Sequence, residues 1–231
     1  RFKRVLQHLK TFSGYFKTRA NRLLEDISLS GAGWLFCFYT LRGANIQIIK
    51  FFNMNKYHKI LDKILTRGKI QENKKGGIKY LINEVLELKP IDLLEIFEGH
   101  GIARNKLKNE LQLFIQGERL TERYREIGVN WLDYCGPILV NSYPTYFEQL
   151  PKLIEKINRE KRSSKNYVLF LGSTNAESNQ QPCLSLIQFQ IDNGKLIVSA
   201  YQRSSDASLG LPADIYHLYL ISKQIDVPLK S

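Results

Sequence analysis

Cysteine is scarce in this chain of 231 residues, and its three positions, Cys37, Cys135 and Cys183, form no C-x-x-C pair. This odd, unpaired set excludes the disulfide framework of small secreted domains, so we expect a reducing compartment and no metal centre. Long apolar stretches are also missing, because the longest run, residues 31–41, has about half the length that a bilayer span requires. Internal repeats and low-complexity tracts are absent, which excludes repeat architectures.

Acidic residues are missing from the first 24 positions. Residues 1–60 hold 11 Lys and Arg against Glu25 and Asp26, and therefore carry +9 of the net charge of +12. Apolar spacing predicts a helix over residues 1–26. This composition suits a transit peptide, a basic amphipathic helix, or a solvated helix packed on its own domain. We expect residues 1–55 to form a basic, partly helical extension, and the protein to be cytoplasmic, with the mitochondrion as the alternative.

The rest of the chain has the periodicity of a folded domain. Apolar positions at helical spacing predict helices over residues 57–66, 106–116, 147–160 and 212–224. Shorter apolar or alternating runs predict strands over residues 78–88, 167–171, 184–191 and 195–201. A turn at residues 192–194 joins the last two strands, and Gly117 is expected to end the helix over 106–116.

Residues 181–219 carry the chain's most informative motif, QPCLSLIQFQIDNGKLIVSAYQRSSDASLGLPADIYHLY. Cys183 stands at the start of a predicted strand. The run Gln202-Arg203-Ser204-Ser205-Asp206 follows about twenty residues later, at the end of the next predicted strand. A thiol, a guanidinium group and a hydroxyl grouped in this way indicate a nucleophile beside an anion site.

The order and spacing of this motif resemble the thymidylate synthase superfamily, whose members read P-C-H-x-x-x-Q-F and then Y-Q-R-S-x-D-x-x-L-G-x-P-x-(N/D)-I. Three earlier segments are similar to the family's opening helix with its phosphate loop, its helix H-E-L-L-W-F-L-x-G-D, and its W-D-x-x…G-P segment; here they read YHKILDKILTRGKIQENKKGG, KNELQLFIQGE and NWLDYCGP. The resemblance covers residues 57–224. It implies an α+β domain over residues 56–231, with a mixed β-sheet, flanking helices, and a sheet face that pairs two chains into a homodimer.

The resemblance also implies two catalytic residues. Cys183 holds the place of the cysteine whose thiolate adds to C6 of a pyrimidine ring and thereby activates C5. Glu110 matches the family's helix glutamate, which handles protons at the base through ordered water. An acid on an apolar helix face is costly unless it is paired or functional, which supports that role; a solvent-exposed helix charge is the alternative.

Further positions match the family's substrate-binding residues. Arg203 would hold the nucleotide phosphate and favour the Cys183 thiolate by its charge, and Ser204 would add a hydroxyl. Gln202 and Asp206 lie in the same motif, and the backbone amide of Asp206 resembles the contact to the pyrimidine O2. Other matches complete the phosphate site: Lys74, beside Lys75, where an arginine usually stands, and Arg162 and Lys165 as the ligands that a partner subunit would lend.

Asp214 indicates which base is bound. In thymidylate synthases this position is Asn, whose amide donates to uracil O4 and accepts from N3–H. Cytosine reverses both groups, and a protonated Asp donates to N3 and accepts from the 4-amino group. Asp214 therefore favours a cytidine nucleotide, dCMP or CMP, over dUMP. The alternative is an ordinary acid in the first turn of a helix.

The expected one-carbon donor is 5,10-methylenetetrahydrofolate, and the expected enzyme is a methyltransferase-class protein. Hydride from folate would give a methylpyrimidine, whereas capture of the methylene group by water would give a hydroxymethylpyrimidine. Asp214 favours a cytidylate hydroxymethylase.

Several departures support a second hypothesis. Leu184 replaces the histidine that follows the cysteine. Leu139 stands where the family has an active-site tyrosine, although Tyr143 lies close in sequence. Nothing after Asp226 resembles the family's folate-closing part. The chain is thus expected to be C-terminally incomplete or to have lost that lid. The alternative function is a catalytically inactive subunit that binds nucleic acid or an acidic partner through residues 1–55.

Overall fold

The computed structural model describes residues 56–73, 76–99, 102–173 and 181–230. These residues belong to one compact unit, Met54–Ser231. The helix predicted over residues 1–26, the proposed role of the basic extension and the phosphate contact predicted for Lys74 all lie outside the described residues.

The first described elements are a helix and a hairpin. The helix predicted over residues 57–66 is α2 (Lys56–Arg67), and the strands β1 (Lys69–Asn73) and β2 (Gly76–Tyr80) pair antiparallel after it. The strand predicted over residues 78–88 is wrong beyond Tyr80, because β1 offers only five residues to pair with. The apolar run near residues 91–97 lies in a helix, α3 (Pro90–Gly99).

Five helices follow in the middle of the chain: α4 (Arg104–Ile115), α5 (Thr121–Glu126), α6 (Leu132–Cys135), α7 (Tyr143–Phe147) and α8 (Leu150–Glu160). Helix α4 ends as predicted, because Gly117 adopts φ 73°, a left-handed conformation that glycine accepts without strain. The helix predicted over residues 147–160 is α8, and it begins three residues later than expected, with a proline in its first turn.

The main sheet has three strands in the order β3 (Val168–Phe170), β4 (Leu184–Asp192) and β5 (Lys195–Gln202). Both strand pairs are antiparallel, and one isolated parallel bridge joins Leu196 to Leu229. The predicted turn between β4 and β5 is present, with positive φ at Asn193 (50°) and Gly194 (72°), as a tight hairpin turn requires.

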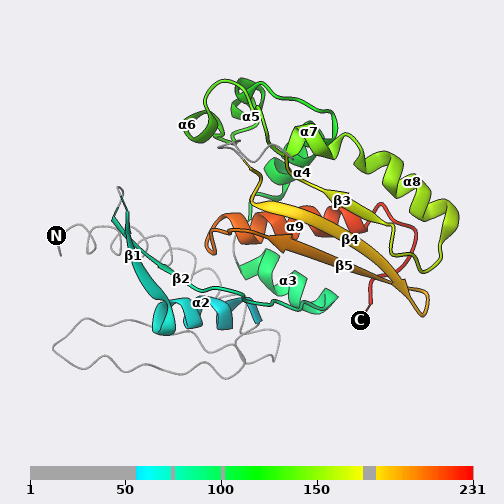
Figure 1. Ribbon diagram of the computed structural model, residues 1–231, viewed down its shortest axis with the longest axis horizontal. Helices are drawn as coiled ribbons and strands as arrows, with labels where there is room; N and C mark the ends of the chain where they lie inside the picture. The colour runs from blue at the N-terminus through cyan, green and yellow to red at the C-terminus, as the bar shows by residue number, and fades with distance from the viewer. Residues whose placement is uncertain (1–55, 74–75, 100–101, 174–180, 231) are drawn as a thin grey trace, which may run out of the picture. The chain divides into compact units, whose positions relative to one another are not determined.

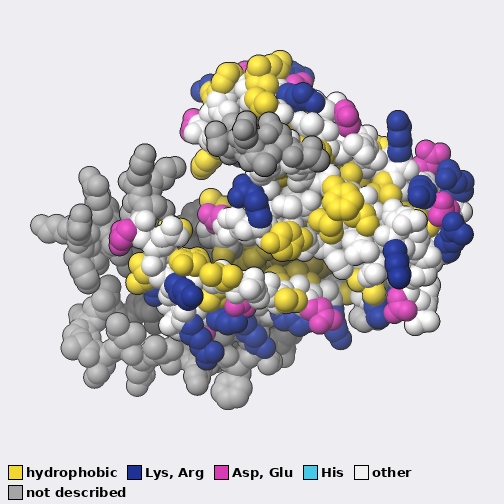
Figure 2. Space-filling view, viewed as in Figure 1, with side chains coloured by type: hydrophobic (Ala, Val, Ile, Leu, Met, Phe, Trp, Pro, Cys, Tyr) yellow, Lys and Arg dark blue, Asp and Glu magenta, His cyan; other side chains and the backbone are white. Residues whose placement is uncertain are grey.

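The two faces of this sheet differ. On one face the side chains are buried in the main core, against residues of α4, α7 and α8: Leu169, Ile187, Phe189, Ile191 and Leu196. Each such side chain contributes about 1.5–3 kcal/mol by leaving water. On the other face Phe170, Leu186 and Tyr201 are neighbours across the three strands, and Phe170 and Tyr201 are 70% and 63% exposed. Figure 2 shows hydrophobic side chains gathered over these strands.

The last helix, α9 (Gly210–Ser222), brings the C-terminal motif to the helices that precede the sheet. It contacts α3, α4 and β5 (Figure 1). Because α4 carries Glu110 and α9 carries Asp214, this packing joins the two predicted acids. Helices around small antiparallel sheets confirm the predicted α+β class. Within the described ranges, no helix is both long and apolar enough to cross a membrane.

Candidate functional site

Glu110 lies on the buried face of α4 and is only 5% exposed. Its Oε1 accepts a hydrogen bond of 2.7 Å from Trp131 Nε1, and its Oε2 lies 3.5 Å from His217 Nε2. Burial raises the pKa of Glu110 to about 7; the Trp131 hydrogen bond lowers it, and the charge of Asp214 raises it. The carboxyl group therefore exists in both protonation states at neutral pH. A solvent-exposed charge, the alternative considered for this residue, is contradicted by its burial.

Asp214 lies on α9 and accepts a hydrogen bond from the Gln202 side-chain amide, which extends from the end of β5. Solvent reaches part of the residue, but protein atoms surround the carboxyl group. Burial therefore raises the pKa of Asp214 to about 7, against the opposing effect of the Gln202 hydrogen bond. A carboxyl group in this state carries a proton in a large fraction of molecules at neutral pH.

Cys183 is half-buried immediately before β4, next to an irregularity in the pairing of β4 with β5. Bulges of this kind change the direction of a side chain and are frequent near active sites. The Arg203 backbone N–H donates to the Cys183 carbonyl at 2.9 Å. The motif's two halves are thus adjacent in space, as their positions at the ends of paired strands predicted.

The Arg203 side chain reaches the segment that precedes Cys183. Its Nε donates to the Pro182 carbonyl at 3.1 Å, and its Nη2 donates to the Gln181 carbonyl at 2.6 Å. No carboxylate in the described part of the chain pairs with Arg203. The guanidinium group therefore fixes the backbone near Cys183 and keeps an uncompensated positive charge at the surface, beside exposed Ser204.

Asp206 holds the turn before α9. Its Oδ1 accepts from the Ser208 amide (2.8 Å), the Ser208 hydroxyl (2.8 Å) and the Leu209 amide (2.9 Å). Burial acts to raise the pKa of Asp206, but these three bonds outweigh it and the pKa is lowered. The side chain thus orders this turn, while the role predicted for the backbone amide of Asp206 stays a prediction.

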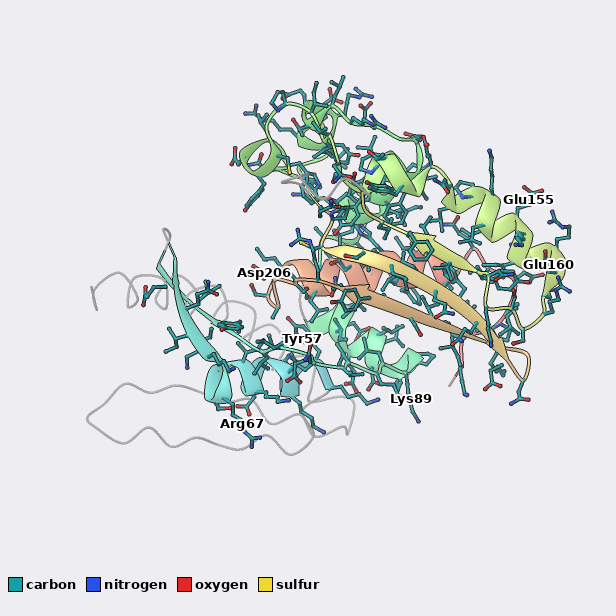
Figure 3. All side chains as sticks on the ribbon, viewed as in Figure 1. Tyr57, Arg67, Lys89, Glu155, Glu160 and Asp206 are labelled. Atoms are coloured by element: carbon teal, nitrogen blue, oxygen red, sulfur yellow. The ribbon has the colours of Figure 1, made fainter. Side chains whose placement is uncertain are left out.

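Arg162 and Lys165 lie far from Cys183 within the same chain. Both are exposed in the loop after α8, where Arg162 Nε is 3.4 Å from a Glu160 carboxylate oxygen. The neighbouring Tyr167 pairs with Phe189, six residues along the strand from Cys183, or roughly 20 Å. Figure 3 shows Glu160 and Asp206 at opposite ends of the sheet.

Three residues that contact Glu110 or the backbone next to Cys183 were not predicted as site residues. Trp131 and His217 contact Glu110, and the Tyr143 hydroxyl accepts the Leu184 N–H at 3.2 Å. Leu139, where a family tyrosine was expected, is fully buried in the core. A small cavity is lined by Tyr143, Leu184, Asp214 and His217 among others. The available signal for His217 was its position three residues after Asp214, which places both on one side of α9.

The pKa of Glu110 has a consequence for stability. A carboxyl group with a pKa raised from 4.5 to about 7 on folding stabilises the fold at low pH, and this contribution disappears as the pH rises through 7. We compare the free energy of unfolding of Glu110→Gln with that of wild type. We expect this difference to shift in favour of the variant by about 2 kcal/mol when the pH rises from 5 to 8. Urea unfolding at both pH values measures this shift. The control is Glu95→Gln, because Glu95 is exposed. An equal shift in both variants would show that the burial of Glu110 is not its cause.

A family model described as thymidylate synthase matches residues 55–226 of this chain. The matched region is well over half of the chain and contains Glu110, Cys183 and Asp214 together with the residues that contact them.

Proposed function

The chain belongs to the thymidylate synthase family, and from that premise we propose that it transfers a one-carbon unit to C5 of a pyrimidine nucleoside monophosphate. The family supports this class of reaction in general. The observation that carries the proposal is the packing of α4 with Glu110 against α9 with Asp214, and the cavity that Asp214 shares with Leu184, the residue after Cys183. We further propose that the preferred substrate is dCMP or CMP and that the product is the hydroxymethylated base.

Cys183 is proposed as the nucleophile. Its thiolate would form an S–C6 bond, which places the electron pair at C5 and lets C5 take up the one-carbon unit. C5 then loses its hydrogen as a proton, the nitrogen of the one-carbon donor leaves the transferred carbon, and water adds in its place to give the hydroxymethyl group. The S–C6 bond breaks to restore the ring. Arg203 supports this role by fixing the carbonyl groups of residues 181 and 182, which directly precede Cys183.

Glu110 is proposed to carry protons at the base. A general acid or base works best when its pKa is near the operating pH, and burial gives Glu110 a pKa of about 7. The Trp131 indole holds one carboxyl oxygen in place at 2.7 Å. This combination of fixed geometry and a titratable proton supports the role.

Asp214 is proposed to select cytosine. Its raised pKa of about 7 supports a protonated carboxyl, which donates to N3 and accepts from the 4-amino group of cytosine. The Gln202 amide holds one of its oxygens, which limits rotation of the carboxyl. A site built for this polarity leaves buried groups unpaired when uracil binds.

The phosphate is proposed to bind at Arg203 and Ser204, which are exposed and carry positive charge and a hydroxyl. The co-substrate 5,10-methylenetetrahydrofolate would supply the one-carbon unit. The half-buried position of Cys183 leaves its sulfur within reach of a substrate that enters from this exposed side.

A covalent trap tests this function. Fluorine at C5 cannot leave as a cation, so a 5-fluoro substrate blocks the loss of the C5 substituent and preserves the S–C6 bond. With 5-fluoro-dCMP or 5-fluoro-CMP plus methylenetetrahydrofolate, we expect a nucleotide adduct in the tryptic peptide 166–195, whose only cysteine is Cys183. An unmodified peptide with both of these nucleotides and with 5-fluoro-dUMP would overturn the proposal.

We also propose that two chains pair through the open sheet face. Family enzymes are usually dimers, and the row of Phe170, Leu186 and Tyr201 is an apolar surface that water would otherwise cover. Pairing would also bring Arg162 and Lys165, which are distant from Cys183 in their own chain, to a partner's phosphate site.

We expect Tyr201→Asp to convert a two-chain particle into single chains, because a charge in an apolar interface is desolvated without a partner. Sedimentation equilibrium measures the mass of both forms. Tyr134→Asp is the matched control, since Tyr134 is 75% exposed on α6 and belongs to none of the three strands. A single-chain mass for the wild type would contradict the pairing.

A further inference from the structure

His217 is a buried histidine whose ring lies close to the Glu110 carboxyl. Its side chain is buried on α9, and its ring meets the Phe114 ring edge-on at 5.8 Å. Its Nε2 lies 3.0 Å from the Leu107 carbonyl oxygen and 3.5 Å from Glu110 Oε2. The Nε2 atom of His217, on α9, therefore faces two groups of α4: the Leu107 backbone carbonyl and the Glu110 carboxyl group.

The Leu107 contact determines the tautomer. A carbonyl oxygen only accepts hydrogen bonds, so Nε2 must carry the proton and donate it. Burial lowers the pKa of His217 to about 4, although the Leu107 bond raises it. The imidazole is therefore neutral at pH 7, and its contact with Glu110 is an N–H dipole beside a carboxyl group, not an ion pair.

The neutral state matters for Glu110. A cation at 3.5 Å would favour the carboxylate and hold the Glu110 pKa low. A neutral N–H restrains the carboxyl group and favours its ionised form only weakly. The other groups that act on Glu110 are the Trp131 indole, which donates to it, the Asp214 carboxyl, and Tyr124, whose own pKa Glu110 helps to raise.

We propose that His217 is a positioning residue for Glu110: the neutral ring, whose Nε2–H donates to the Leu107 carbonyl, lies 3.5 Å from Glu110 Oε2 and confines that oxygen without adding charge to it. The side chain thus complements Trp131: the indole donates to Oε1, and the His217 N–H dipole lies beside Oε2. The catalytic value of this arrangement rests on the proposed function, but the His217–Glu110 contact does not.

The test is the protonation of Glu110 in variants of His217. Infrared difference spectra across pH follow the carboxyl C=O band, and the Glu110→Gln variant identifies the Glu110 component. His217→Leu removes the N–H dipole beside the carboxylate, so we expect the Glu110 midpoint to rise by roughly one pH unit. His217→Gln keeps a neutral N–H donor and is expected to restore a midpoint within about half a unit of wild type.

His217→Asn provides a second removal variant if the leucine variant does not fold, because its shorter amide does not reach α4. An unchanged midpoint in both removal variants would overturn the proposal, and so would a glutamine variant that behaves like leucine. The pH profile of kcat is measured in parallel and is expected to move with the infrared midpoint, while KM changes little. A protein without transferase activity would refute the proposed function, yet the infrared titration would still decide the role of His217.

Discussion

Cys183→Ser is expected to reduce turnover by about 10⁴-fold or more, because a serine hydroxyl is a far weaker nucleophile at neutral pH and removal of a covalent nucleophile removes the step itself. The loss should appear in kcat and in the covalent trapping of 5-fluoro nucleotide, while nucleotide binding persists. Calorimetric binding of dCMP or CMP, together with kcat, separates these effects.

Cys135→Ser is the matched control for that result. Cys135 is also half-buried, but burial and the nearby Cys183 sulfur raise the pKa of its thiol, which keeps it protonated and weakly nucleophilic. We expect this variant to keep turnover within a few-fold of wild type. Equal activity in Cys183→Ser and Cys135→Ser would exclude Cys183 as the nucleophile.

Asp214→Asn is expected to reverse the base preference. The amide of Asn donates where uracil has O4 and accepts where uracil has N3–H, so cytosine would face two mismatched groups. We expect the ratio of kcat/KM for the cytidylate to that for dUMP to fall by about 10³-fold or more. Steady-state kinetics with both nucleotides, under identical folate concentrations, measures the ratio.

The control for the base preference is Asp62→Asn, which makes the same chemical change at an exposed position of α2. Its ratio should equal that of wild type. An Asp214→Asn variant that retains the wild-type ratio while keeping measurable activity would show that Asp214 does not select the base, and the cytidylate proposal would then fail.

The parts of the fold that follow local periodicity were predictable from the sequence. The helix over residues 106–116 and the strands over 184–191 and 195–201 are strongly periodic, and the structure places them as α4, β4 and β5 within a few residues. The strand predicted over residues 78–88 was wrong in length, because a strand ends where its hydrogen-bonding partner ends, and that limit is not visible in the pattern of one segment.

The site was predictable only where a motif carried it. Cys183, Arg203 and Asp214 lie in one continuous stretch, so their proximity followed from two paired strands and the next helix. Trp131 and His217 reach Glu110 from positions 21 and 107 residues away in the chain, through packing of α4 against other elements. Sequence patterns do not encode such contacts directly, although the position of His217 one helical turn after Asp214 was a usable indication.

Release of tritium from C5 of the nucleotide tests the central claim most directly, since C5 must lose its hydrogen after Cys183 has added to C6. Labelled dCMP, CMP and dUMP are incubated separately with the protein, with and without methylenetetrahydrofolate. We predict folate-dependent release that is fastest with a cytidylate and absent in Cys183→Ser. No release from any of the three nucleotides would contradict the account.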